Sequence, residues 1–200
     1  MSTPRTRLGL ATGVSLFVLA PAAMALDIRG TEDADRIIGS RGDDRIAALA
    51  GDDKVLALPG NDKVRAGDGN DKVSGSGGDD LISAGTGDDR VRAGDGQDTV
   101  KARGGADVIS GGDGRDLLTA SAGADVAVEG VDTLVGGSEN DELRARDGEA
   151  DVIDCGRDTD TAVLDLVDVI VDATEENLNG SCEIVVRADV PPDEPPTPTP

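Results

Sequence analysis

The chain has 200 residues, with 41 acidic and 19 basic side chains and a formal net charge of −22. This charge argues against a nucleic-acid-binding role. Because the chain contains no histidine and only one aromatic residue, Phe17, the composition also argues against zinc or copper sites, catalytic triads and aromatic ligand pockets.

Residues 1–25 are typical of a secretory signal peptide. Two arginines precede the apolar run Leu8–Ala20, and an Ala-Met-Ala motif predicts cleavage before Leu26. The run is shorter than the roughly twenty residues that a membrane-spanning helix needs, although an uncleaved anchor remains an alternative. We therefore expect a secreted, extracellular protein with no membrane span after the signal is removed.

From residue 30 to about residue 128 the chain repeats every nine residues. An aspartate recurs at every ninth position from Asp35 to Asp125. If this aspartate is position six, position four is glycine from Gly42 to Gly123, position eight is aliphatic, and position one is glycine or alanine. A fixed short period indicates a solenoid, in which each repeat stacks on its neighbours.

Each repeat predicts a glycine-rich turn followed by a short strand. Glycine permits the positive φ of a tight turn, and the alternating β-branched residues are typical of half-buried strands. Positions eight and one of the next repeat lie two residues apart, so both side chains point inward. We expect a thin core between two sheets, with the basic residues of positions seven and nine facing solvent.

Several repeats carry a specific resemblance. The segments GDGNDKV from Gly67, GTGDDRV from Gly85, GDGQDTV from Gly94 and GGDGRDLLT from Gly111 resemble the RTX, or haemolysin-type, calcium-binding nonapeptide pattern G-G-x-G-x-D-x-U-x. The resemblance covers about residues 30–163. It implies an all-β, right-handed parallel β-roll, a β-solenoid of stacked nonapeptides with two nonapeptides in each coil.

The resemblance also implies a ligand set. Several Ca²⁺ ions would lie between turns stacked eighteen residues apart, held by the position-six aspartates and by turn carbonyls. Asp35 is left out because its repeat departs most from the pattern. The implied metal ligands are Asp44, Asp53, Asp62, Asp71, Asp80, Asp89, Asp98, Asp107, Asp116 and Asp125.

Some turns depart from the family pattern. The motif's second glycine is replaced by Leu49, Leu58, Ser76, Arg103 and Ser121. We expect these turns to bind weakly or only to bridge better sites.

The residue types favour calcium independently of the resemblance. Hard divalent cations take six to eight oxygen ligands, and these turns offer only carboxylates and carbonyls, whereas magnesium demands a strict octahedron and keeps its waters. Glycine-rich repeats with a thin core bury little apolar surface against a large ordering cost. We therefore expect a largely disordered metal-free array that folds when calcium binds.

After Asp125 the period becomes irregular, with aspartates at 132, 141, 151 and 160. We expect the roll, residues 26–163, to continue there with a deletion and a bulge. The apolar segment Ala162–Val171 predicts a strand that covers the open end, within a capping segment at 164–188. Residues 189–200 are a Pro/Thr-rich tail, expected to be extended.

Cys155 and Cys182 are the only cysteines, and an exported chain favours a disulfide between them. Free or intermolecular thiols remain the alternative. The bond would tie the segment after Cys182 to the last repeats and would limit the freedom of the unfolded chain.

We expect a non-enzymatic, secreted calcium-binding repeat protein of bacterial type, and a monomer. The alternative function is a cell-surface adhesion or spacer module that calcium stiffens, with the cell surface or the extracellular matrix as its partner. Paired carboxylates are abundant, but they are all alike, whereas glycosidase catalysis needs one differentiated pair in a cleft.

Overall fold

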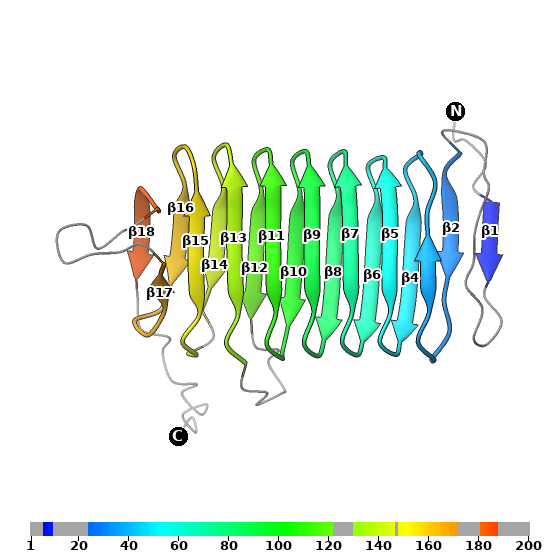
Figure 1. Ribbon diagram of the computed structural model, residues 1–200, viewed down its shortest axis with the longest axis horizontal. Coiled ribbons are helices and arrows are strands. Elements are labelled where there is room, and N and C mark those ends of the chain that lie inside the picture. The colour runs from blue at the N-terminus through cyan, green and yellow to red at the C-terminus, as the bar shows by residue number, and fades with distance from the viewer. Residues whose placement is uncertain (1–5, 10–23, 122–129, 147, 172–180, 188–200) are drawn as a thin grey trace, which may run out of the picture.

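The computed structural model describes residues 6–9, 24–121, 130–146, 148–171 and 181–187. Their regular structure consists of strands, arranged as two parallel sheets in two layers (Figure 1). No helix among these residues is long and apolar enough to cross a membrane.

From β2 onward, consecutive strands alternate between the two sheets. Sheet A runs in the order β1-β2-β4-β6-β8-β10-β12-β14-β16-β18, and sheet B in the order β17-β15-β13-β11-β9-β7-β5-β3. The strands of sheet A are β1 (Thr6–Gly9), β2 (Leu26–Arg29), β4 (Arg45–Ala50), β6 (Lys63–Asp68), β8 (Leu81–Thr86), β10 (Thr99–Arg103), β12 (Leu117–Ser121), β14 (Glu142–Ala145), β16 (Thr161–Leu164) and β18 (Ile184–Arg187). The strands of sheet B are β3 (Arg36–Ile38), β5 (Lys54–Pro59), β7 (Lys72–Gly77), β9 (Arg90–Asp95), β11 (Val108–Asp113), β13 (Thr133–Ser138), β15 (Val152–Gly156) and β17 (Val169–Ile170).

One strand from each sheet makes one coil. In sheet A, Ile46 of β4 pairs with Val64 of β6, and Val64 pairs with Ile82 of β8, so equivalent residues are eighteen apart. The predicted all-β parallel β-roll with two nonapeptides per coil is therefore confirmed.

The core lies between the sheets and follows the predicted alternation. In β6, Val64 and Ala66 are buried, whereas Lys63 and Arg65 are exposed. Every regular coil adds one aliphatic and one small side chain from each sheet. The sheets can approach closely because one of these two side chains is only an alanine methyl or a glycine hydrogen.

The predicted deletion after Asp125 is wrong. Val108 of β11 pairs with Thr133 of β13, a separation of twenty-five residues in place of eighteen, so the chain has an insertion between β12 and β13. Residues 122–129 lie outside the described part of the chain. Thr133 then pairs with Val152, nineteen residues on, which agrees with the predicted one-residue bulge.

The predicted strand Ala162–Val171 is in fact two strands in different sheets. β16 ends at Leu164 and β17 begins at Val169, with a bend at Leu166 and Val167 between them. The N–H of Asp165 donates to Oδ2 of Asp168 at 2.9 Å, and this local bond competes with an extended chain.

The C-terminal end is tied back by the predicted disulfide. Cys155 of β15 and Cys182 are joined with their Cα atoms 5.2 Å apart, and both side chains are buried. At the other end of sheet A, Thr6–Gly9, within the predicted signal peptide, pairs with Leu26–Arg29. The predicted tail, residues 189–200, lies outside the described residues.

Candidate metal centre

The position-six aspartates form hydrogen-bonded ladders along the turns. The main-chain N–H of Asp62 donates to Oδ1 of Asp80 at 2.8 Å, and the N–H of Asp80 donates to Oδ1 of Asp98 at 2.8 Å. Each carboxylate thus binds the backbone of the preceding coil.

The two edges of the roll each carry one ladder. The first ladder occupies the turns that lead from sheet B to sheet A, and consists of Asp44, Asp62, Asp80, Asp98, Asp116, Asp141 and Asp160. The second ladder occupies the opposite turns and consists of Asp35, Asp53, Asp71, Asp89, Asp107, Asp132, Asp151 and Asp168.

Glu183 ends the first ladder. Its Oε2 accepts the N–H of Asp160 at 2.8 Å, in the place where another aspartate would stand. A glutamate after the last regular coil therefore satisfies a main-chain donor that would otherwise face the open end.

The turns are fixed by their glycines. Gly78, at position four, has a φ of 110°, and a Cβ there would lie 2.7 Å from the main-chain carbon of Gly60 in the preceding coil. Its N–H donates to the carbonyl oxygen of Asp95 in the following coil at 2.8 Å. Only glycine combines this conformation with so close an approach between stacked turns.

In ten of the ladder carboxylates, the second oxygen is buried without a hydrogen-bond partner among the described residues. The ladder aspartates are at most 5% exposed. A buried polar atom without a partner is uncommon, and a row of them on carboxylates indicates a binding site for a cation. The Oδ2 atoms in this condition belong to Asp53, Asp62, Asp71, Asp80, Asp89, Asp98, Asp107, Asp116, Asp141 and Asp160.

Main-chain carbonyl oxygens lie in the same space. A Cβ at Gly75 would overlap both Oδ2 of Asp80 and the carbonyl oxygen of Ala93. A carboxylate of one coil and a carbonyl of the next therefore converge on one point beside the turn. The same arrangement recurs for Gly39 with Asp44 and Ala57, for Gly111 with Asp116 and Gly136, and for Gly136 with Asp141 and Cys155.

Burial raises the pKa values of ten ladder carboxyls, among them those of Asp98 and Asp160. The pKa of Asp107 rises to about 8, and those of Asp53 and Asp71 to about 6. Loss of hydration is the main cause, the N–H from the preceding coil opposes it, and neighbouring carboxylates add to the rise. The pKa values raised to about 7 are those of Asp62, Asp80, Asp89, Asp116 and Asp141.

The ligands available to a cation are oxygens. Among the described residues, no group of three or more His, Cys, Asp or Glu side chains converges as a metal cluster. A site here would therefore combine carboxylate oxygens with main-chain carbonyls, a donor set that suits a hard cation such as calcium.

Nine of the ten predicted ligands, Asp44 to Asp116, stand on the two ladders. Asp125 lies outside the described residues, and the second ladder passes from Asp107 directly to Asp132. Asp168 extends this ladder and was missed by sequence reasoning. The signal was present, because Asp168-Val169-Ile170 repeats the D-x-U part of the motif.

Position five forms a separate, exposed ladder. The N–H of Asn61 donates to Oδ1 of Asp43, and the N–H of Asp79 donates to Oδ1 of Asn61, both at 3.0 Å. The N–H of Gln97 donates in turn to Oδ1 of Asp79. Acids alternate with amides, which separates like charges. These side chains stabilise the outside of the turn, away from the buried Oδ2 atoms.

A comparison with protein families finds repeated matches over this region. The family model for the RTX calcium-binding nonapeptide repeat, which describes four copies, matches residues 29–64, 56–91, 65–100, 92–127 and 126–162. No curated protein matches the chain. The matched residues cover two thirds of the sequence and include both ladders from Asp35 to Asp160.

Proposed function

This chain belongs to the RTX calcium-binding nonapeptide repeat family, and we propose that it is a secreted calcium-binding repeat protein that folds when calcium binds between its stacked turns. The observation that carries the proposal is the pair of buried ladders, in ten of whose carboxylates one oxygen is bonded to the main chain and the other is buried without a hydrogen-bond partner among the described residues.

In these ten aspartates the two carboxylate oxygens have different roles. Oδ1 holds the main chain of the preceding coil, which fixes the side chain in one orientation. Oδ2 then faces the carbonyl of the following coil, as at Asp80 and Ala93. Calcium, when bound, supplies the positive charge and takes the six to eight oxygens that such turns can provide.

Electrostatics supports the coupling between metal binding and folding. Each ladder stacks buried carboxylates one coil apart, and a buried charge without a counter-ion is strongly unfavourable. In the metal-free chain these groups oppose the compact state, whereas in the unfolded chain they are hydrated. A cation that binds only the stacked turns therefore stabilises the folded state.

We propose a binding and structural role without catalysis. The ladders repeat one chemical group in one environment, so no carboxyl is differentiated as an acid from a neighbour that acts as a base. Their function is better described as cooperative uptake of ions along two edges.

Export through the N-terminal signal belongs to the same proposal. Cleavage before Leu26 would remove β1 and leave β2 as the terminal strand of sheet A. Leu26 and Ile28 point into the core, so β2 retains its packing on the rest of the roll.

A calcium titration followed by calorimetry and far-ultraviolet circular dichroism tests the proposal. We expect heat of binding to accompany a gain of β signal as the chelated protein receives calcium, and no such gain with magnesium. A β spectrum that is unchanged in chelator would contradict the coupling between folding and calcium binding. A calorimetric titration without heat of binding would contradict calcium binding itself.

A further inference from the structure

Four basic side chains form a row across sheet B. The register places Arg36 of β3 beside Lys54 of β5, Lys54 beside Lys72 of β7, and Lys72 beside Arg90 of β9. All four are exposed. We call these four residues the basic row. It ends at β11, where Val108 takes the next place.

The basic row has no described acidic partner. None of its four side chains forms an ion pair with a described residue. Among the described side chains, an ion pair is found instead between Arg144 and Glu142 on sheet A. Successive strands lie about 4.8 Å apart, so the row stacks like charges at close range. Such a row destabilises the sheet by itself and is relieved by an anion.

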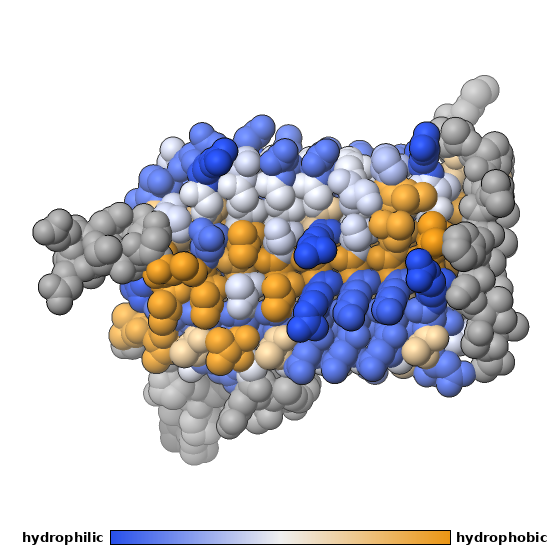
Figure 2. Space-filling model, in the orientation of Figure 1, coloured by the Kyte–Doolittle hydropathy of each residue, from blue (hydrophilic) through white to orange (hydrophobic). Residues whose placement is uncertain are grey.

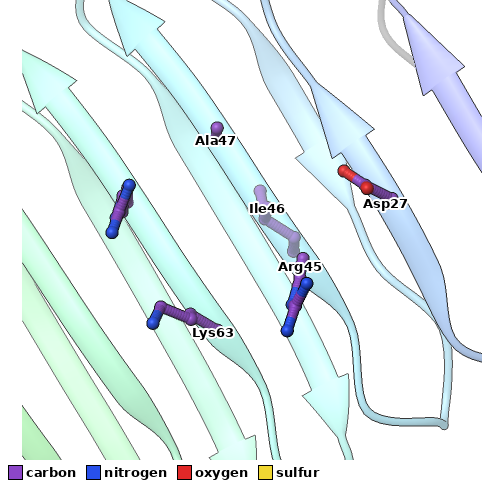
Figure 3. A pocket seen from close by; sticks show the side chains of 6 residues that line it. Asp27, Arg45, Ile46, Ala47 and Lys63 are labelled. Carbon is purple, nitrogen blue, oxygen red and sulfur yellow. The ribbon is translucent and has the colours of Figure 1, made fainter.

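The opposite face is built differently. On sheet A the corresponding row begins with an acid, because Asp27 stands beside Arg45, which stands beside Lys63 (Figure 3). On sheet A the row of cations contains only Arg45 and Lys63 before Leu81, and it begins next to the carboxylate of Asp27. The uninterrupted row is thus a property of one face of the roll.

The basic row lines a groove of about 540 Å³ on sheet B. The second row of the groove is mostly uncharged, with Ile38, Leu56 and Ser74 before Arg92. Figure 2 shows this face: strongly hydrophilic side chains gather over its N-terminal half and apolar ones over its C-terminal half, with a further apolar group beside the N-terminal strands. A ligand in this groove would meet a line of charges beside the aliphatic side chains of Ile38 and Leu56.

From this arrangement we infer that the basic row binds a linear anionic polysaccharide with one acid group on each sugar ring. Such a chain carries its charges in single file, and one ring is close in length to one strand spacing. Its rings can also lie against Ile38 and Leu56. Binding at this surface requires the folded roll, but the polysaccharide would contact the basic side chains directly and not a bound calcium ion.

Other polyanions fit the row less well. An extended acidic peptide presents same-face side chains about 6.6 Å apart, so it falls out of step with strands about 4.8 Å apart. An anionic membrane would favour basic residues spread over the whole face, whereas here they occupy one line.

Binding of oligogalacturonate to the full-length protein in calcium provides the test. We expect K54Q/K72Q to weaken binding about tenfold, and added salt to weaken binding of the unchanged protein. The matched control, R45Q/K63Q, removes the same charge from sheet A and should bind normally. Circular dichroism checks that both variants keep the β spectrum and its calcium response, which separates this test from that of calcium binding.

Three results would overturn the inference. The first is no binding of oligogalacturonate by the folded protein. The second is an equal loss in the two variants, which would indicate general charge attraction or calcium bridging at the turn edges. The third is tighter binding of polyglutamate or polyuridylate, which would assign the row to a peptide or to a nucleic acid.

Discussion

The carboxylate of Asp98 reaches the backbone of Asp80 one coil earlier: its Oδ1 accepts the N–H of Asp80 at 2.8 Å, while its Oδ2 is buried without a hydrogen-bond partner. One side chain therefore both joins two coils and presents a negative charge to the space between them. This double role explains why the repeat requires aspartate and not only a small polar residue.

Asp80→Asn should weaken calcium binding while it preserves the link to Asp62. The amide oxygen can still accept the N–H of Asp62, but the anionic Oδ2 is lost. We expect about a tenfold higher calcium concentration at the midpoint of folding. Asp79→Asn is the matched control, since it removes the same charge from the exposed position-five ladder. The ligand assignment fails if both variants shift the midpoint equally in a calcium titration.

Low pH should stabilise the metal-free folded state and so replace part of the stabilisation that calcium provides. The ladder carboxyls have an ordinary pKa of 3.8, which the fold raises to about 7 for Asp80 and about 8 for Asp107. A raised pKa means that the folded state binds protons more tightly than the unfolded state. The resulting stability is complete below pH 4 and is lost as the pH rises through about 6 to 8.

Denaturant unfolding of the metal-free protein at several pH values measures this effect. We expect the free energy of unfolding to fall between pH 4 and pH 8, and calcium to be required mainly at the upper end. Calcium affinity should change in the opposite direction, because protons compete for the same oxygens at low pH. A metal-free protein that becomes more stable as the pH rises would contradict the raised pKa values.

Leu49→Gly should stabilise the roll. Leu49 has a φ of 95°, a conformation that is unfavourable for a side chain with a Cβ. Glycine removes this strain but increases the freedom of the unfolded chain, so we expect a net gain of about 0.5–1 kcal/mol. The contrasting variant is Gly67→Ala at the paired position in β6, where a Cβ would overlap the carbonyl oxygen of Leu49. Thermal unfolding in calcium should move in opposite directions for the two variants.

Loss of the disulfide should loosen the C-terminal coils. Cys155 and Cys182 are separated by 27 residues, and opening a loop of this size costs about 3–4 kcal/mol by chain entropy. We expect C155S/C182S to lower the thermal midpoint, with early hydrogen exchange in β15 to β18. A reductant should have the same effect on the unchanged protein and none on the variant, and a reductant effect on both would exclude the disulfide as its cause.

The regular coils could be predicted from the sequence because every position of the repeat constrains the same structure. Val64 and Ala66 alternate with Lys63 and Arg65, and this pattern defines the strand, its inward face and its partner eighteen residues away. The position-six aspartates could be selected for the same reason. The signal peptide and the tail stay predictions.

The irregular coils could not be predicted, since spacing alone does not give the register. The seven residues from Asp125 to Asp132 suggested a shortened repeat, but β11 pairs with β13 and the second ladder passes from Asp107 to Asp132. A weak signal existed at Ala127, which offers only a methyl where other repeats have a larger aliphatic residue. The different roles of Oδ1 and Oδ2 could also be seen only in the structure, because the groups that these oxygens face lie in another coil.

The direction of the aspartate ladders makes the length of the roll adjustable. From Asp35 to Asp151, each ladder N–H finds its acceptor in the coil that follows, so a coil inserted or deleted in the middle changes neither neighbour's requirements. At the end of the first ladder a different acid takes the place of the aspartate, since Glu183 accepts the N–H of Asp160. A lineage could therefore lengthen or shorten this protein by duplicating or losing eighteen-residue units, as long as one acid remains at the end.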